Sequence, residues 1–119
     1  MAYTMQQSVE DGGHIDISKT KEVIEAGFKC PAYVTAGVQE ILSDIEVEGQ
    51  SYQGRLWDML LMAKIEIKRM QREQDHFGVF HVLFAEQTKK QLSVKLRKVK
   101  LFVSFNSYVG FSFMLPEEY

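Results

Sequence analysis

Residues 52–72, YQGRLWDMLLMAKIEIKRMQR, carry the longest helical pattern of the chain and contain its single tryptophan, Trp57. Apolar side chains recur here at helical spacing and group on one broad face. That face consists of Leu56, Met59, Leu60, Ala63, Ile67 and Met70. Further apolar residues, Leu61 and Ile65, continue onto another side, so we predict a central helix that is covered on two sides. An alternative interpretation makes Trp57 and an exposed Met62 a partner-binding patch.

The chain before this helix is predicted to be mostly helical, after a flexible N-terminal lead that comprises residues 1–13. Ser18 or Thr20 is suited to cap a brief helix. Thr35 has the same character and precedes a segment, about residues 36–45, whose apolar side chains recur every three to four positions. We therefore expect a short strand at Ile15–Ile17 and two short helices before the central one.

After the central helix the apolar residues alternate with polar ones, which is typical of strands. The predicted strands are residues 77–85, 91–105 and 109–115. The alternation changes phase at Arg97 and Lys98, so we expect a β-bulge there. The predicted fold is α+β in a single domain, residues 1–119: about three helices followed by a three-stranded antiparallel meander packed on the central helix, residues 52–72.

Composition indicates an ordinary globular protein, because 45% of the residues are hydrophobic and 25% are charged. The single cysteine, Cys30, cannot form an internal disulfide, which is typical of a reducing compartment. No apolar run approaches the roughly 18 residues of a membrane span. The N-terminus also lacks the basic and apolar regions of a secretory signal. We therefore expect a cytoplasmic protein with no membrane segment; the sequence leaves its oligomeric state open.

No group of residues has the spacing of a catalytic, metal or phosphate-binding site. His14, His76 and His81 are far apart or alternate across a strand, and Cys30 has no second cysteine. Cys30, followed by Pro31, is open to two interpretations: a nucleophile with a histidine nearby, or a small apolar side chain. We expect no catalytic residue, no metal and no cofactor, and a small enzyme is the third of three functional hypotheses.

Charge is distributed unevenly along the chain. Residues 1–48 hold nine acidic and three basic residues, a net charge of −6, whereas the remainder has a net charge of +4. The acidic helical half is the expected surface for a basic protein partner. The candidate residues of this partner surface are Glu40, Asp44, Glu46, Glu48, Arg55 and Asp58.

A run of basic residues marks the predicted hairpin. The run is Lys89, Lys90, Lys95, Arg97, Lys98 and Lys100, with no acidic residue between them. With the bulge, the last four would share the outward face and end at Phe102. Such a ribbon can bind nucleic acid or another anion. It can equally be a solvated face that protects a sheet edge, or meet an acidic protein. The sequence pI of about 5.9 argues against a dedicated DNA-binding domain.

Several short blocks resemble an uncharacterised family of small proteins that are encoded mainly on bacterial plasmids, phages and other mobile elements. The matching residues are Glu10–Gly12, Ile15–Ser18, Glu25–Phe28, Pro31, Thr35, Tyr52–Ala63 and Met114–Glu118. The most specific parts are GRLWD, at residues 54–58, and the C-terminal MLPEE. This chain departs from the family in the loop before Tyr52 and in the lysine-rich hairpin.

The resemblance implies no established activity, but it implies an accessory gene of a mobile element. Proteins of this size and context are often inhibitors or modulators of host machinery, including anti-defence proteins. The first hypothesis is therefore a non-enzymatic protein-interaction module that modulates host defence or nucleic-acid machinery. The second is a nucleic-acid-binding accessory protein that uses residues 89–100.

Overall fold

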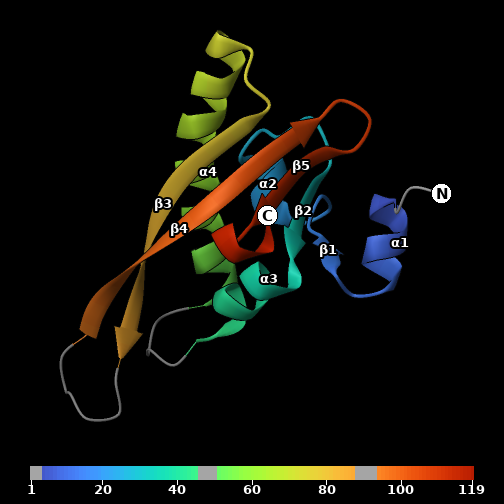
Figure 1. The fold of residues 1–119 in the computed structure, drawn as a ribbon. Helices are drawn as coiled ribbons and strands as arrows, with labels where there is room; N and C mark the ends of the chain where they lie inside the picture. The colour runs from blue at the N-terminus through green and yellow to red at the C-terminus, as the bar shows by residue number, and fades with distance from the viewer. Residues whose placement is uncertain (1–3, 46–50, 88–93) are drawn as a thin grey trace.

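The computed structural model describes residues 4–45, 51–87 and 94–119 of the chain, drawn in Figure 1. In chain order the elements are α1 (Met5–Glu10), β1 (His14–Asp16), α2 (Lys21–Glu25), β2 (Ala32–Thr35), α3 (Ala36–Ser43), α4 (Tyr52–Glu73), β3 (Phe77–Gln87), β4 (Val94–Asn106), β5 (Gly110–Met114) and the 3-10 turn η1 (Pro116–Glu118). Within the described residues the strands form one five-stranded sheet in the order β1-β2-β5-β4-β3. The α+β class is confirmed.

The expected three-stranded antiparallel meander is extended by two strands and is therefore mixed. β2 pairs with β5 in parallel, and β1 adds to β2 in antiparallel. At the start of the parallel pair, Phe111 N–H donates to the carbonyl oxygen of Pro31 at 2.8 Å. Gly110 precedes this contact with a φ of +117°, and a Cβ there would lie 2.2 Å from the same oxygen. Only glycine fits this junction, which joins the N-terminal strands to the hairpin.

The caps of the short helices are those that the sequence predicts. The hydroxyl of Thr20 accepts a hydrogen bond from Val23 N–H, and that of Thr35 accepts one from Val38 N–H. Part of the expected flexible lead is a helix instead, because α1 lies within residues 1–13. A capping box between Thr4 and Gln7 begins this helix.

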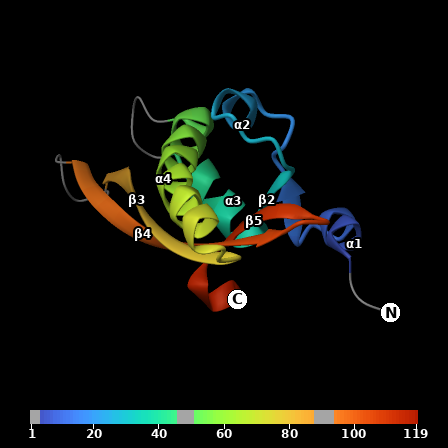
Figure 2. The ribbon, with the colours of Figure 1, turned by 90° about the horizontal axis from the view of Figure 1, so that it is seen from above.

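Helix α4 packs its broad apolar face on the sheet. The buried apolar residues of α4 are Leu56, Met59, Leu60, Ala63, Ile67 and Met70, as predicted. The expected cover on a second side is wrong: Ile65 is 66% exposed and Leu61 is also exposed. Figure 2 shows the reason, because α4 and α2 lie on one face of the sheet and, among the described residues, no further layer covers them. Within the described part of the chain, no helix has both the length and the apolar character of a membrane crossing.

The hairpin of β3 and β4 is regular and has no bulge at Arg97 and Lys98. Its register runs without interruption, and it pairs Phe84 with Arg97 and Leu83 with Lys98. The predicted phase shift has a different cause. The hairpin extends past the other strands (Figure 1), and there Leu96 lies on the outer face, 68% exposed. Leu96 is apolar although it lies beyond the core, so it interrupts the alternation of apolar and polar residues from which the bulge was predicted.

Candidate functional site: the edge of strand β3

Strand β3 is the long edge of the sheet, and its odd-numbered residues turn their backbone polar groups away from β4. This direction follows from three contacts, because Phe77 C=O, Val79 N–H and Ala85 C=O all bond to side chains of α4. In an antiparallel pair the direction alternates along the strand. The intervening odd-numbered residues, His81 and Leu83, therefore also turn their N–H and C=O groups to the free edge.

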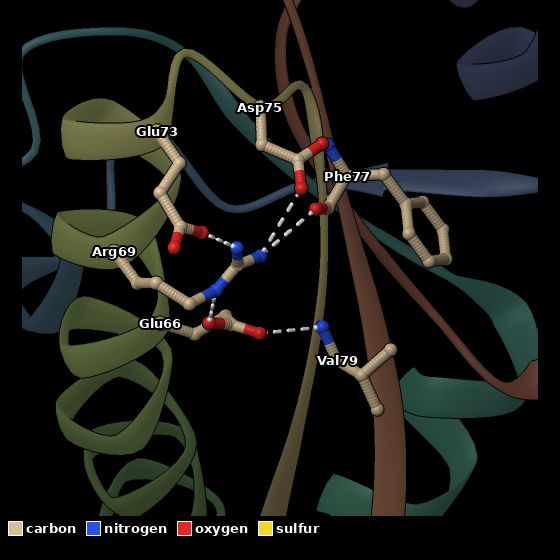
Figure 3. Close-up of polar contacts among 6 residues, drawn as sticks. All are labelled: Glu66, Arg69, Glu73, Asp75, Phe77 and Val79. Atoms are coloured by element: carbon tan, nitrogen blue, oxygen red, sulfur yellow. Dashed lines mark hydrogen bonds and ion pairs between the residues drawn. The ribbon is translucent and has the colours of Figure 1, made fainter.

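The first end of the edge is capped by a charged cluster from the last turns of α4, shown in Figure 3. The Glu66 carboxylate accepts a hydrogen bond of 2.8 Å from Val79 N–H, and it is also paired with Arg69. The Arg69 guanidinium further donates to Phe77 C=O and to the carboxylates of Glu73 and Asp75. The Glu66–Arg69 pair therefore caps a strand edge in addition to linking one helical turn.

The hydrogen bonds of this cluster shift the pKa of Arg69 and the pKa of Asp75. Hydrogen bonds from the Arg69 guanidinium, chiefly to Glu66 and then Glu73, raise the pKa of Arg69. The pKa of Asp75 is lowered, mainly because its carboxylate accepts the backbone N–H of Phe77 and also faces Arg69. The negative forms of the acids and the positive form of Arg69 therefore hold one another in place.

The other end of the edge is capped by Arg55, which is only 4% exposed. Its guanidinium donates to Ala85 C=O at 2.8 Å and to Ile41 C=O at 2.7 Å, and it lies over the ring of Phe84 at 5.2 Å. Arg55 therefore joins α3, α4 and β3. This burial contradicts its expected place on a partner surface, and no ion pair with Asp58 occurs among the described residues.

Between the two caps lies a segment that we call the β3 window, residues His81–Leu83. No side chain in the described ranges bonds to the outward backbone groups of His81 or Leu83. On α4, Met62 lies on the same stripe as Arg55 and Glu66, seven and four residues away, so it faces this middle part of the edge. Met62 is 41% exposed, and Ile65 lies next to it. The window thus combines free backbone groups with exposed apolar side chains.

The outer face of the hairpin adds a second apolar and basic surface. Leu83 is 55% exposed and pairs across the strands with Lys98, while His81 pairs with Lys100. Leu96 is a diagonal neighbour of Leu83 on the same face. The outer side of the window is therefore apolar at Leu83 and Leu96 and positively charged beside them.

The expected single basic ribbon is divided between two faces. Lys95 and Arg97 share a face with the buried Val99, because no bulge intervenes, whereas Lys98 and Lys100 lie on the outer face. All four side chains are exposed. Their neighbours in the predicted ribbon, Lys89 and Lys90, lie outside the described residues. The structure therefore separates the described bases into two pairs that point in opposite directions.

The acidic residues of the expected partner surface are placed only in part. Glu40 and Asp44 are exposed on and just after α3, and Asp58 is exposed on α4. Partial burial raises the pKa of Asp58. Glu46 and Glu48 lie outside the described residues. Whether these side chains meet a partner stays a prediction.

The histidines occupy separate environments. Nδ1 of His14 lies 2.6 Å from the hydroxyl oxygen of Ser8, and burial lowers the pKa of His14. The ring of His76 stacks on Phe105, and His81 is exposed on β3. Among the described residues, no three His, Cys, Asp or Glu side chains are arranged to hold a metal ion.

Sequence reasoning missed both the β3 window and the role of Arg55. One signal was present: Arg55, Met62, Glu66 and Arg69 recur at helical spacing and form a single stripe. Nothing in the stripe itself shows that a strand edge lies against it. Comparison with known proteins adds no relative, since no family model, curated protein or solved structure matches the chain. The resemblance to mobile-element proteins stays a prediction.

Proposed function

We propose that this protein is a non-enzymatic protein-binding module that takes up an extended segment of its partner along the β3 window. The proposal rests on one observation: side chains cap the backbone of the β3 edge at its two ends and leave the middle uncapped. Side chains from α4 bond to the edge at Phe77, Val79 and Ala85, and leave His81 and Leu83 between them. Strand addition uses such free backbone groups for affinity and adjacent side-chain sites for specificity.

The side chains around the window define the partner segment. Residues of the added strand that point toward α4 would meet Met62 and Ile65, and those that point to the outer face would meet Leu83. His81, Lys98 and Lys100 lie beside the outer position and favour acidic residues there. The partner segment is therefore extended and short, and it alternates apolar with acidic side chains. The resemblance to mobile-element proteins favours a host protein as its source.

The test removes one outward N–H from the edge. Leu83→Pro deletes a donor that does not bond to β4, and proline is tolerated at such edge positions. Leu96→Asn is the matched control, because it changes the same outer face without altering the edge backbone. Each protein is used to capture partners from a lysate of host cells, with nuclease added, and the captured proteins are identified by mass spectrometry.

We expect a nuclease-resistant protein that the natural sequence and Leu96→Asn retain and that Leu83→Pro loses at least about tenfold. Circular dichroism melting serves as the control for folding of each variant. Equal capture by Leu83→Pro would contradict strand addition. Loss of capture through charge reversal at Glu40 and Asp44 alone would instead favour the acidic helical surface.

Nucleic-acid binding is the second candidate, and the outer pair of lysines favours it. The Lys100 ammonium lies 5.8 Å from the centre of the Phe102 ring, so a cation and an aromatic side chain adjoin on an exposed face. Reversing charge in Lys98→Glu/Lys100→Glu separates the two candidates. If the natural protein binds an oligonucleotide in a salt-dependent way and this variant does not, the second function is supported. If the natural protein binds no oligonucleotide, the second function is excluded.

A further inference from the structure

A groove of about 810 Å³ opens on the side of α4 that faces away from the β3 window. The connection between α2 and β2 forms one wall, and the C-terminal half of α4 with the turn into β3 forms the other. Lys64, Ile67 and Gln71 line it, and at 3.6 residues per turn they lie opposite Met62 and Arg69 on the helix. The groove and the edge are therefore separate surfaces.

The floor of the groove is apolar and largely aromatic. Phe28 lies 5.5 Å from Phe111 between ring centres, and Phe105 lies 4.8 Å from Phe111. His76 extends the layer, since its ring is nearly parallel to that of Phe105. Ile67 completes the floor from the helix. A groove of this size and lining is typical of a small-molecule site.

The rim, in contrast, is positively charged. Lys29 from the α2–β2 connection and Lys64 and Lys68 from α4 all line the groove. None of the three takes part in an ion pair within the described ranges. The one carboxylate that lines the groove, Asp75, is already bonded to Phe77 N–H and faces Arg69. The positive charge at the rim is therefore left for a ligand.

We propose that this groove binds a small apolar carboxylic acid, with its aromatic or alkyl body on the phenylalanine floor and its carboxylate at the lysine rim. Burial of the body on the floor would supply most of the affinity. The lysines would select an anion over a neutral or cationic molecule of the same shape. No arginine lines the groove, so the planar two-point recognition that suits phosphate groups is missing among its lining residues.

Two carboxylate probes distinguish an alkyl body from an aromatic one: dodecanoate, used below its micellar concentration, and 2-naphthoate. Dodecyltrimethylammonium is the control with opposite charge. Binding is measured by titration calorimetry on the full chain. Because Cys30 is the only cysteine and lines the groove, its alkylation rate by N-ethylmaleimide gives a second, independent readout.

The variant Lys64→Gln/Lys68→Gln removes two rim charges and leaves the floor intact. Its matched control is Lys19→Gln/Lys21→Gln, which removes two lysines that do not line the groove. We expect one carboxylate probe to bind with 1:1 stoichiometry and to slow the alkylation of Cys30. The rim variant should bind about tenfold more weakly, and the control variant should bind as the natural sequence does.

Three results would overturn the proposal: no binding of either carboxylate, equal affinity in the rim variant, or equal binding of dodecyltrimethylammonium. Because Leu83→Pro leaves the groove unchanged, its ability to bind the probe separates failure here from failure of the protein-binding function. Both tests use folded protein, and among the described residues Lys64 and Lys68 take part in no ion pair.

Discussion

The two edges of the sheet are protected in different ways. β1 has three residues, and the helix α1 packs beside it, joined by the Ser8–His14 hydrogen bond. β3 has eleven residues, and among the described residues its outward backbone groups are bonded by side chains only at Phe77, Val79 and Ala85. A short, covered strand exposes few unpaired backbone groups to another chain. A long strand that is capped only at its ends exposes the N–H and C=O groups of its middle residues.

The two edges therefore differ in how much free backbone they offer to another chain. Long exposed edges promote aggregation, and natural proteins usually protect them with charged residues, proline, bulges or a covering element. Here the blocking groups stop at Val79 and begin again at Ala85. Because exposed apolar residues adjoin the same interval on both faces, we propose that the partly capped edge is a binding surface.

The largest expected effect comes from opening the capped end of β3. In Arg55→Met the volume is nearly kept, but the carbonyl groups of Ile41 and Ala85 lose their donor. We expect the free energy of unfolding to fall by about 2–3 kcal/mol, because each buried carbonyl loses its hydrogen bond while release of a buried charge offsets part of the loss. Urea denaturation measures this.

The same variant should lengthen the exposed edge and promote self-association, which analytical ultracentrifugation detects. Arg55→Lys is the matched control, since one ammonium can retain one of the two carbonyl contacts. Unchanged stability in Arg55→Met would contradict the role of this residue as a cap.

A smaller effect is expected at the covered edge. Ser8→Ala removes the hydroxyl that lies 2.6 Å from Nδ1 of His14, in a position that is nearly buried. We expect a loss of about 1 kcal/mol in the free energy of unfolding, the usual value of one such hydrogen bond. Self-association should stay as in the natural sequence, because α1 still covers β1. If Ser8→Ala associates as Arg55→Met does, the two edges are not protected differently.

The smallest effect is a dependence on pH at the Glu66–Arg69 cluster. The pKa of Asp75 is lowered in the folded protein, so its contribution to stability is present above the unfolded pKa of about 3.9. That contribution is lost as the pH falls through the lower, folded pKa. Asp75→Asn should therefore lower the melting temperature slightly at pH 7 and progressively less toward pH 3. A difference that grows as the pH falls would contradict this assignment.

Local elements were predictable because their signals are local. Thr20 and Thr35 cap helices through bonds three residues away, and the face of α4 is set by its own periodicity. The T-x-x-Q signal at Thr4–Gln7 was also present, but we assigned that segment to a flexible lead. In each of these cases neighbouring residues specify the structure.

The mixed sheet was not predictable in the same way. β2 has four residues, too few to show a period, and its parallel partner β5 begins more than 70 residues later. The candidate site has the same difficulty. Arg55 looks like a surface residue of a helical stripe until α4 is placed against β3, and the β3 window exists only between groups that tertiary structure brings to it.

Whether the β3 window is open in the free protein can be measured by amide hydrogen exchange along β3, followed by NMR. The N–H groups of Phe80, Val82 and Phe84 point to β4 and should exchange slowly, and Val79 should also be slow because it donates to Glu66. His81 and Leu83 should exchange much faster, by about a hundredfold or more, and should become protected when the partner binds. Slow exchange of His81 and Leu83 in the free protein, equal to that of Val82, would contradict the existence of an open window.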